Sequence, residues 1–447
     1  MAHASSHGAA RTGSSGRMAR AGHDTRPCGA THTRAGGRHL AVDVLQLLCV
    51  SACALALLPA PAGSAPSQVP PVPVGPSPVA PAPQRAEFSF SLLKKVSPGA
   101  RCLDGSPPGY YYRRGYGTGK RNWLFFLPGG AWCYSPRSCR KRTHTLLGSS
   151  SLWPHPADPA FQTKLKRLTG YGFTGVLHGS AAVNPLMHNW HVVVVAYCDG
   201  AAFSGTRGRF NTSRTASLVA GGRSILKNVV RHVRVSRGLR RARRVVVAGC
   251  SAGAQAVAMQ CDALSHLLPP GAVKRCIMDG GFFPDWRDMS GVYFLRKVAQ
   301  RLVAMHNISG DSDCLRGEGP DSQWRCFFPE HGVRHVSTPL LVVNSVNDVD
   351  ALTLLNLHSP NRRRLHRCLL SLAGRGKPQC SKEDAGTALA YTVRVAGLVK
   401  EAARRNPSVK KFLYHDRLHC ATLENRWSSV QGDGGALRDV LNYFALS

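Results

Sequence analysis

Acidic residues are scarce in this chain of 447 residues. It carries 24 aspartates and glutamates against 58 lysines and arginines, which gives a formal net charge of +34. A field of this sign favours polyanions: nucleic acid, an anionic membrane surface or an acidic polysaccharide. The sequence has no zinc knuckle, no RNP-like aromatic strand and no basic region backed by heptads, so we expect no nucleic-acid partner. We interpret the arginine-rich stretches at 231–244 and 362–364 as solvated, charged faces.

Metal-binding spacings are missing as well. No C-x-x-C pair and no cluster of cysteine and histidine occurs, which argues against a zinc site.

Of the 15 cysteines, three lie in the first 65 residues and 12 follow, from Cys102 to Cys420. An even number in an exported chain predicts mostly paired disulfides. Two N-glycosylation sequons, at Asn211 and Asn307, would be usable in the same compartment.

The apolar run Val44–Leu58 is short for a membrane span. It has 15 residues, whereas a comfortable span needs about 20. Small residues at Pro61–Ala65 follow it, so we predict that residues 41–65 are a secretory signal peptide. Residues 1–40 are predicted to be a disordered basic leader. Because this leader is long, an uncleaved type II anchor is the alternative, and only then would the chain touch a membrane.

Apolar, β-branched runs alternate with helix-like segments once a proline-rich spacer at 66–87 has ended. Such runs are typical of strands that are buried on both faces of a parallel sheet. We therefore expect a three-layer α/β sandwich with a mostly parallel central sheet, in one catalytic domain at 88–447. The expected strands are Asn122–Leu127, His191–Cys198, Arg243–Gly249 and Pro339–Ser345. The expected helices are Thr215–Val233, the segment after Ser251, and Ala388–Arg405.

A serine stands between two glycines directly after one of these strands, in "GCSAG" at 249–253. A strand, a tight turn and a helix in this order are typical of a nucleophile elbow, which presents a serine hydroxyl above the sheet edge. The same letters also fit a plain strand-to-helix turn, so the interpretation of Ser251 depends on finding partners. The neighbouring Cys250 should point into the fold, and we expect a structural or disulfide role for it rather than a nucleophilic one.

A nucleophilic serine needs a base, an acid that orients the base, and donors for an oxyanion. In hydrolases of this kind the acid and then the histidine follow the serine along the chain. The loop after the strand Pro339–Ser345 offers Asp348 and Asp350, and the segment past the last long helix offers His415 and His419.

Donors for the oxyanion should come from a glycine-rich loop, because its backbone N–H groups are unobstructed by side chains. "PGGAWC" follows the strand Asn122–Leu127 and fits this role. We expect the donors to be Gly130 and Ala131 from this loop, together with Ala252 after the serine.

Eight blocks of sequence follow one another along the chain: "CLDGSPPGYYY", "NWLFFLPGGAWC", "NPLMHNWHVVVVAYCDGAAFSG", "GCSAGAQA", "DGGFFPDW", "CFFPEH", "VNSVNDVD" and "HDRLHC". They resemble the successive signature blocks of the pectin acetylesterase/Notum family, in the family's order from about Phe90 to Asn442. The loop "GGAWC" is similar to the plant-type "GGGWC" rather than to "GGWYC" of the animal Notum branch.

The resemblance implies an α/β-hydrolase-like fold, a Ser-Asp-His triad and neither a metal nor an organic cofactor. Carried over by position, Ser251 is the nucleophile, Asp348 the acid and His419 the base. Two positions depart from the family pattern. Pro128 stands where the family usually has glutamate, and Ala254 stands where it usually has a second glycine.

These features predict a secreted carboxylesterase that removes O-acetyl groups from a cell-wall polysaccharide, above all pectin, because positive charge suits an acidic galacturonan. One alternative keeps the chemistry but acts on a fatty acyl ester of a secreted protein, as in the Notum branch. Another is a glycan-binding relative that has lost turnover through Pro128. A retained anchor would instead hold the protein in the lumen of the Golgi or endomembranes. No feature of the sequence points to an oligomeric state.

Overall fold

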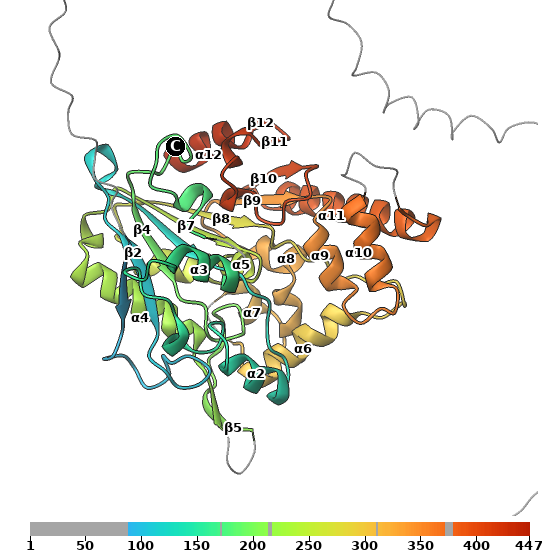
Figure 1. Ribbon diagram of the computed structural model, residues 1–447, viewed down its shortest axis with the longest axis horizontal. Helices are drawn as coiled ribbons and strands as arrows, with labels where there is room; N and C mark the ends of the chain where they lie inside the picture. Colours follow the sequence, from blue (N-terminus) through green and yellow to red (C-terminus); the bar gives the residue numbers. More distant parts are fainter. Residues whose placement is uncertain (1–87, 170–171, 213–216, 310–311, 372–378) are drawn as a thin grey trace, which may run out of the picture. The chain divides into compact units, whose positions relative to one another are not determined.

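The computed structural model describes residues 88–447 except 170–171, 213–216, 310–311 and 372–378 (Figure 1). The predicted leader, signal and spacer therefore lie outside the described residues. Ten strands form one sheet in the order β1-β2-β4-β3-β7-β8-β9-β10-β11-β12. They span Ser89–Leu92 (β1), Gly109–Arg113 (β2), Asn122–Leu127 (β3), His191–Val195 (β4), Arg244–Cys250 (β7), Val273–Asp279 (β8), Leu340–Ser345 (β9), Val409–Tyr414 (β10), Gln431–Gly432 (β11) and Gly435–Ala436 (β12).

The centre of the sheet is parallel. Strands β4, β3, β7, β8, β9 and β10 pair in parallel, and antiparallel pairs extend the sheet at both sides through β1 and β2 and through β11 and β12. All six parallel strands therefore end at the same edge of the sheet, where loops can bring residues from distant parts of the chain together.

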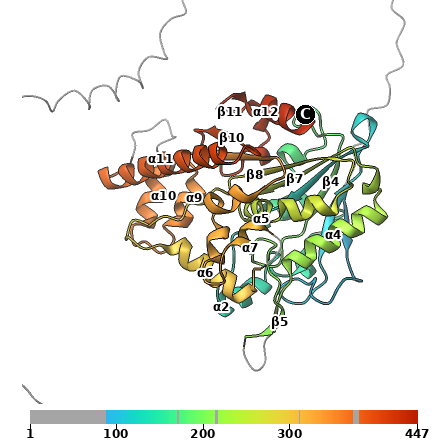
Figure 2. The same ribbon diagram turned by 180° about the vertical axis from the view of Figure 1, so that it is seen from behind.

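Side chains of the parallel strands alternate between two buried cores. In β3, for example, Trp123 and Phe125 belong to one core, and Leu124 and Phe126 to the other. Helices cover both faces, and Figures 1 and 2 show α12 on the side opposite to α4 and α5. The predicted three-layer α/β architecture is confirmed. The α-helices span Pro136–Thr143 (α2), Phe161–Thr169 (α3), Gly222–Ser236 (α4), Ala252–Leu267 (α5), Phe294–His306 (α6), Asp313–Gly317 (α7), Pro329–Gly332 (α8), Val349–Leu355 (α9), Arg362–Ser371 (α10), Lys382–Arg405 (α11) and Leu437–Leu446 (α12).

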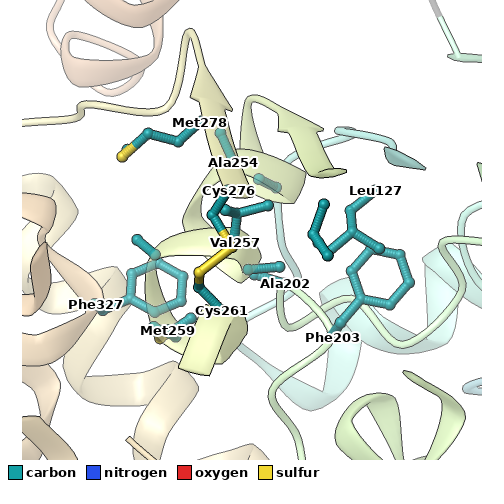
Figure 3. Close-up of a cluster of buried hydrophobic side chains, with 14 of the residues drawn as sticks. Leu127, Ala202, Phe203, Ala254, Val257, Met259, Cys261, Cys276, Met278 and Phe327 are labelled. Carbon is teal, nitrogen blue, oxygen red and sulfur yellow. A yellow bond between two sulfur atoms is a disulfide. The ribbon is translucent and has the colours of Figure 1, made fainter. Parts of the chain in front are cut away.

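Helix α5 runs through the core. Every residue from Ala252 to Cys261 is buried, and a helix that is surrounded by core needs no polar face. Figure 3 shows Ala254 and Val257 among the packed side chains, and the disulfide between Cys261 and Cys276 that joins α5 to β8. Because the first turn of α5 follows Ser251 directly, this packing also fixes the serine.

One expected helix is partly wrong. The segment Thr215–Val233 begins with a strand, β6 (Ser217–Ala220), which forms a hairpin with β5 (Gly208–Asn211), and helix α4 starts only at Gly222. Two successive glycines at 221–222 have low helix propensity and separate the two elements. The expected strand His191–Cys198 also ends early, at Val195.

All 12 cysteines after the spacer form disulfides, as predicted. The disulfide pairs are Cys102–Cys198, Cys133–Cys139, Cys250–Cys420, Cys261–Cys276, Cys314–Cys326 and Cys368–Cys380.

None of the helices in the part of the chain that the structure describes combines the length and the apolar character needed to cross a membrane.

Candidate active site

Ser251 occupies a sharp turn between β7 and α5. Its backbone lies at φ 58° and ψ −122°, a conformation that costs a residue with a side chain about 1–3 kcal/mol. Two backbone hydrogen bonds hold it there: Ser251 N–H donates to the carbonyl of Asp279 at 2.9 Å, and Gln255 N–H donates to the carbonyl of Ser251 at 3.1 Å. Such a turn presents the hydroxyl at the carboxyl edge of the sheet.

The glycine-rich loop after β3 lies directly against this serine. A Cβ atom on Gly129 would be 2.6 Å from the Cβ of Ser251, so a side chain there would collide with the serine. Within the described residues, the backbone N–H groups of Gly130, Ala131 and Ala252 have no hydrogen-bond acceptor. These three donors, which the sequence predicted for an oxyanion, are therefore free to bind one.

An acid–base pair lies at the same edge of the sheet. His419 Nδ1 is 2.7 Å from Asp348 Oδ2, and the two side chains are only 10% and 1% exposed. The other oxygen of Asp348 accepts a hydrogen bond from Ala351 N–H at 2.8 Å, which fixes the carboxylate. The remaining sequence candidates, Asp350 and His415, are exposed. The structure thus brings together Asp348 and His419.

The charge of this pair changes the basicity of the histidine. Burial opposes a charged imidazole, but the charge of Asp348 and its hydrogen bond, with smaller contributions from Asp350 and Asp279, raise the pKa of His419 above its usual value. Because Asp348 contacts Nδ1, that nitrogen carries the shared proton, and Nε2 is left to exchange protons with a reacting group.

A disulfide connects the histidine loop to the serine turn. Cys250 precedes Ser251, Cys420 follows His419, and their Cα atoms are 5.8 Å apart. The expected disulfide role of Cys250 is confirmed. Residues 170 positions apart in the sequence are thereby held next to each other.

Comparison with known proteins identifies the family of this chain. A family model described as pectinacetylesterase matches residues 82–436. The chain belongs to the pectinacetylesterase family. It is 33% identical over 259 residues to pectin acetylesterase 7 of Arabidopsis thaliana, 58% of this chain and 61% of that protein. It is 34% identical over 252 residues to Arabidopsis pectin acetylesterase 5, 56% and 55% of the two chains.

Animal relatives match at a lower identity. The palmitoleoyl-protein carboxylesterase NOTUM of Homo sapiens is 30% identical over 270 residues, which is 58% of this chain and 50% of that protein. The chain thus spans between about half and three fifths of the length of these curated relatives.

The two departures from the family pattern are accommodated locally. Pro128 follows β3, whose last paired residue is Leu127, opposite Gly249. The donor that a proline lacks is therefore not needed by the strand ladder. Ala254 is fully buried in the core beneath the serine turn (Figure 3), so its methyl group is part of the packing.

Tyr197 supports the glycine-rich loop and was not predicted from the sequence. Its hydroxyl donates to the carbonyl of Ala131 at 2.7 Å and accepts from Ala202 N–H at 3.1 Å. The guanidinium of Arg142 lies 5.0 Å from the centre of its ring. Burial raises the pKa of Tyr197, which keeps the hydroxyl protonated as a donor. The block "YCDGAAFSG" contains this residue, but its letters do not reveal the contact.

Asp279, at the end of β8, is a second residue that the sequence did not single out. Its backbone carbonyl accepts from Ser251, and its buried Oδ2 accepts from both N–H and Oγ1 of Thr422 at 2.7 and 2.6 Å. Thr422 lies three residues after His419, so one residue connects the serine turn and the histidine loop. Burial raises the pKa of Asp279 to about 7, and hydrogen bonds from Thr422 oppose this shift.

Two groups of side chains among the described residues have the spacing of metal ligands. In the first, Cys133 and Cys139 are joined in a disulfide beside His306, so neither sulfur is a free thiolate. The second is the pair Asp348 and His419 with Asp350 nearby, and its ring nitrogen is already engaged by a carboxylate. The first group therefore offers no thiolate, and the second already uses one ring nitrogen and one carboxylate in the Asp348–His419 pair.

Removal of the Cys250–Cys420 disulfide should both destabilise the fold and misplace the histidine. We expect the Cys250→Ala/Cys420→Ala variant to lose about 2–4 kcal/mol of unfolding free energy, because the bond closes a long loop. Labelling of Ser251 by a fluorophosphonate, which reacts with activated serines, should slow as well. The matched control is Cys314→Ala/Cys326→Ala, whose bond spans 12 residues; labelling at the wild-type rate in both variants would contradict this role.

Substitution of Asp279 should impair labelling of Ser251 beyond any loss of stability. In Asp279→Ala the N–H of Thr422 loses its acceptor, and we expect labelling to slow by roughly 10- to 100-fold as the histidine loop shifts. Asp262→Ala is the control, because that carboxylate also accepts from two backbone N–H groups, those of Ser337 and Thr338, elsewhere in the fold. Equal labelling rates in variants matched for thermal stability would show that Asp279 is merely structural.

Proposed function

We propose that this chain is an exported serine carboxylesterase that removes O-acetyl groups from pectin. One observation carries the proposal: a buried Asp348–His419 pair is joined by a disulfide to the strained turn at Ser251. Serine hydrolases combine a serine on a strained turn with an imidazole that a carboxylate orients. Membership of the pectinacetylesterase family and the names of its Arabidopsis relatives support the acetyl ester and the polymer.

The reaction follows from the roles of these groups. His419 Nε2 takes the proton of the Ser251 hydroxyl as its oxygen attacks the ester carbonyl, and Asp348 holds the ring that has become charged. The N–H groups of Gly130, Ala131 and Ala252 bind the oxyanion. His419 then protonates the departing sugar alcohol, which leaves an acetyl-serine. Water, deprotonated by the same imidazole, releases acetate.

A small acyl group suits the space beside the serine. Trp132 is buried and packs edge-on against Phe283 and Phe327, with ring centres 5.6 and 5.5 Å apart. Phe283 in turn lies 6.1 Å from the ring of His419. These aromatic rings pack closely on the side of His419, which supports a small acyl group there. The described apolar cavities beneath Gly129 are lined by neither Ser251 nor His419.

Charge and disulfides support an exported enzyme with an acidic polymer as substrate. Six disulfides are typical of proteins that mature in an oxidising compartment. A net charge of +34 attracts a polyuronate at low ionic strength. Neutral glycans gain nothing from such a field.

Acyl length should separate the acetyl from the fatty acyl activity. We expect nitrophenyl acetate to be hydrolysed with a kcat/KM at least about tenfold higher than nitrophenyl octanoate, because each added methylene must fit beside the serine. The Ser251→Ala variant should lose both activities and the release of acetate from acetylated pectin. A preference for octanoate would favour the fatty acyl alternative. Binding of pectin without any hydrolysis would favour the glycan-binding alternative.

The pH profile should report the raised pKa of His419. The base must be neutral to accept a proton, and a raised pKa means that the neutral form is lost at a higher pH than in free histidine. We therefore expect kcat/KM for nitrophenyl acetate to rise with pH along a limb centred above about 6.5. In Asp350→Asn the limb should move to lower pH, because a nearby negative charge is removed. A limb at or below the value of free histidine would contradict the assigned electrostatics.

A further inference from the structure

Five basic side chains gather at the edge of the sheet opposite to Ser251. Lys120 and Arg121 precede β3, and Arg240, Arg241 and Arg243 precede β7. The two segments touch, because Arg121 Nε donates to the carbonyl of Arg241 at 3.3 Å and Arg243 N–H donates to the carbonyl of Arg121 at 2.7 Å. All five residues are exposed. We call this group the basic edge.

No carboxylate neutralises the basic edge. Its five side chains form no ion pair with any residue that the structure describes, whereas Lys164, Arg316 and Arg438 each have an acidic partner. Solvated surfaces of folded proteins usually mix both signs of charge. The basic edge therefore differs from an ordinary charged face.

The sequence around the basic edge explains this imbalance. Between residues 105 and 261 the chain has 23 lysines and arginines but only two acidic residues, Asp158 and Asp199. Asp199 is fully buried, and Asp158 pairs with Lys164. Neither can offset the cluster. Like charges held together in this way repel each other, and binding of a polyanion relieves the repulsion.

The surroundings favour a polyuronate over other polyanions. Single-stranded nucleic acid is bound with the help of several exposed aromatic rings. The strand residues Tyr112 and Trp123 are buried, and α12, whose last turn accepts a hydrogen bond from Arg244, offers the one exposed ring of Tyr443 rather than a row of rings. The six disulfides favour a compartment outside the cytosol. The Arabidopsis relatives are named for pectin, an acidic polysaccharide.

The basic edge is separate from the site of the reaction. Strand β7 runs from Arg244 to Cys250 and separates Arg243 from Ser251. Seven residues at about 3.3 Å each place the two ends roughly 20 Å or more apart. A small ester at Ser251 therefore cannot touch the basic edge, whereas a long polymer chain can occupy both.

We propose that the basic edge anchors the uronate backbone of an acidic polysaccharide, apart from the site of ester hydrolysis. This inference rests on the proposed function, since it identifies how the polymer of that function is held. Anchoring converts attack on the next acetyl group into a local event at a raised effective concentration. The basic edge should thus lower KM for polymers and leave small esters unaffected.

The test compares two variants of the full chain that each lose three positive charges. Arg240→Gln/Arg241→Gln/Arg243→Gln alters the basic edge, and Lys164→Gln/Arg316→Gln/Arg438→Gln removes basic residues that have acidic partners. Binding to polygalacturonate is measured by co-sedimentation over a range of NaCl concentrations. Hydrolysis of nitrophenyl acetate is measured in parallel, and thermal unfolding shows that both variants fold.

We expect the first variant to bind polygalacturonate roughly 10- to 100-fold more weakly, with a salt dependence reduced by roughly two counterions. The matched variant should bind as the wild type does, and both should hydrolyse nitrophenyl acetate normally. Equal weakening in both variants, no weakening in either, or no binding by the wild type would overturn the proposal. So would selective loss of binding to single-stranded RNA or to phosphatidylserine vesicles with retained binding to polygalacturonate. Absence of nitrophenyl acetate hydrolysis in the wild type would instead refute the proposed function and leave the binding result intact.

Discussion

The disulfide between Cys250 and Cys420 is the constraint on which the rest of the site depends. Ser251 follows β7 and His419 follows β10, and these strands are separated in the sheet by β8 and β9. The segment that carries His419 therefore crosses two strand ends before Cys420 meets Cys250. Burial alone would not select that path, since a loop at the sheet edge has many places to lie. The disulfide and the hydrogen bonds that Thr422 donates to Asp279 restrict the loop to one path.

The parallel sheet explains why chemistry and charge lie apart. Its strands end at one edge, where polar loops meet and the proposed catalytic groups converge, and begin at the other, where the segments that enter the strands carry lysine and arginine. Strands β3 and β9 contain no charged residue, and in β8 and β10 the lysines and arginine stand at the second and third positions. The basic residues therefore gather near the strand starts, away from the buried carboxylates Asp279 and Asp348 at the other edge.

The sequence predicted those features that depend on local order and missed those that depend on pairing in space. Strand β3 and the turn at Ser251 were predictable because apolar runs and flanking glycines act locally. From the residues alone, Asp348 and Asp350 were equally good candidates for the acid, and the family resemblance was needed to choose Asp348. The structure places Asp348 in contact with His419 and leaves Asp350 exposed. The contacts of Tyr197 and Asp279 could not be predicted, because they join segments that are distant in the chain. The hairpin at β6 was missed because an apolar run of that length fits either a helix or a strand.

The proposed acyl selectivity and the proposed anchoring of a polymer rest on different physical effects. Trp132, Phe283 and Phe327 pack against one another on the side of His419, and such packing acts over a few ångströms and is insensitive to salt. The field of the basic edge extends over about a Debye length and is screened by ions. Under the proposed function, shape selects the ester bond and charge holds the polymer. Because the basic edge and the serine turn lie at opposite ends of strand β7, we expect a substitution at one to leave the other intact.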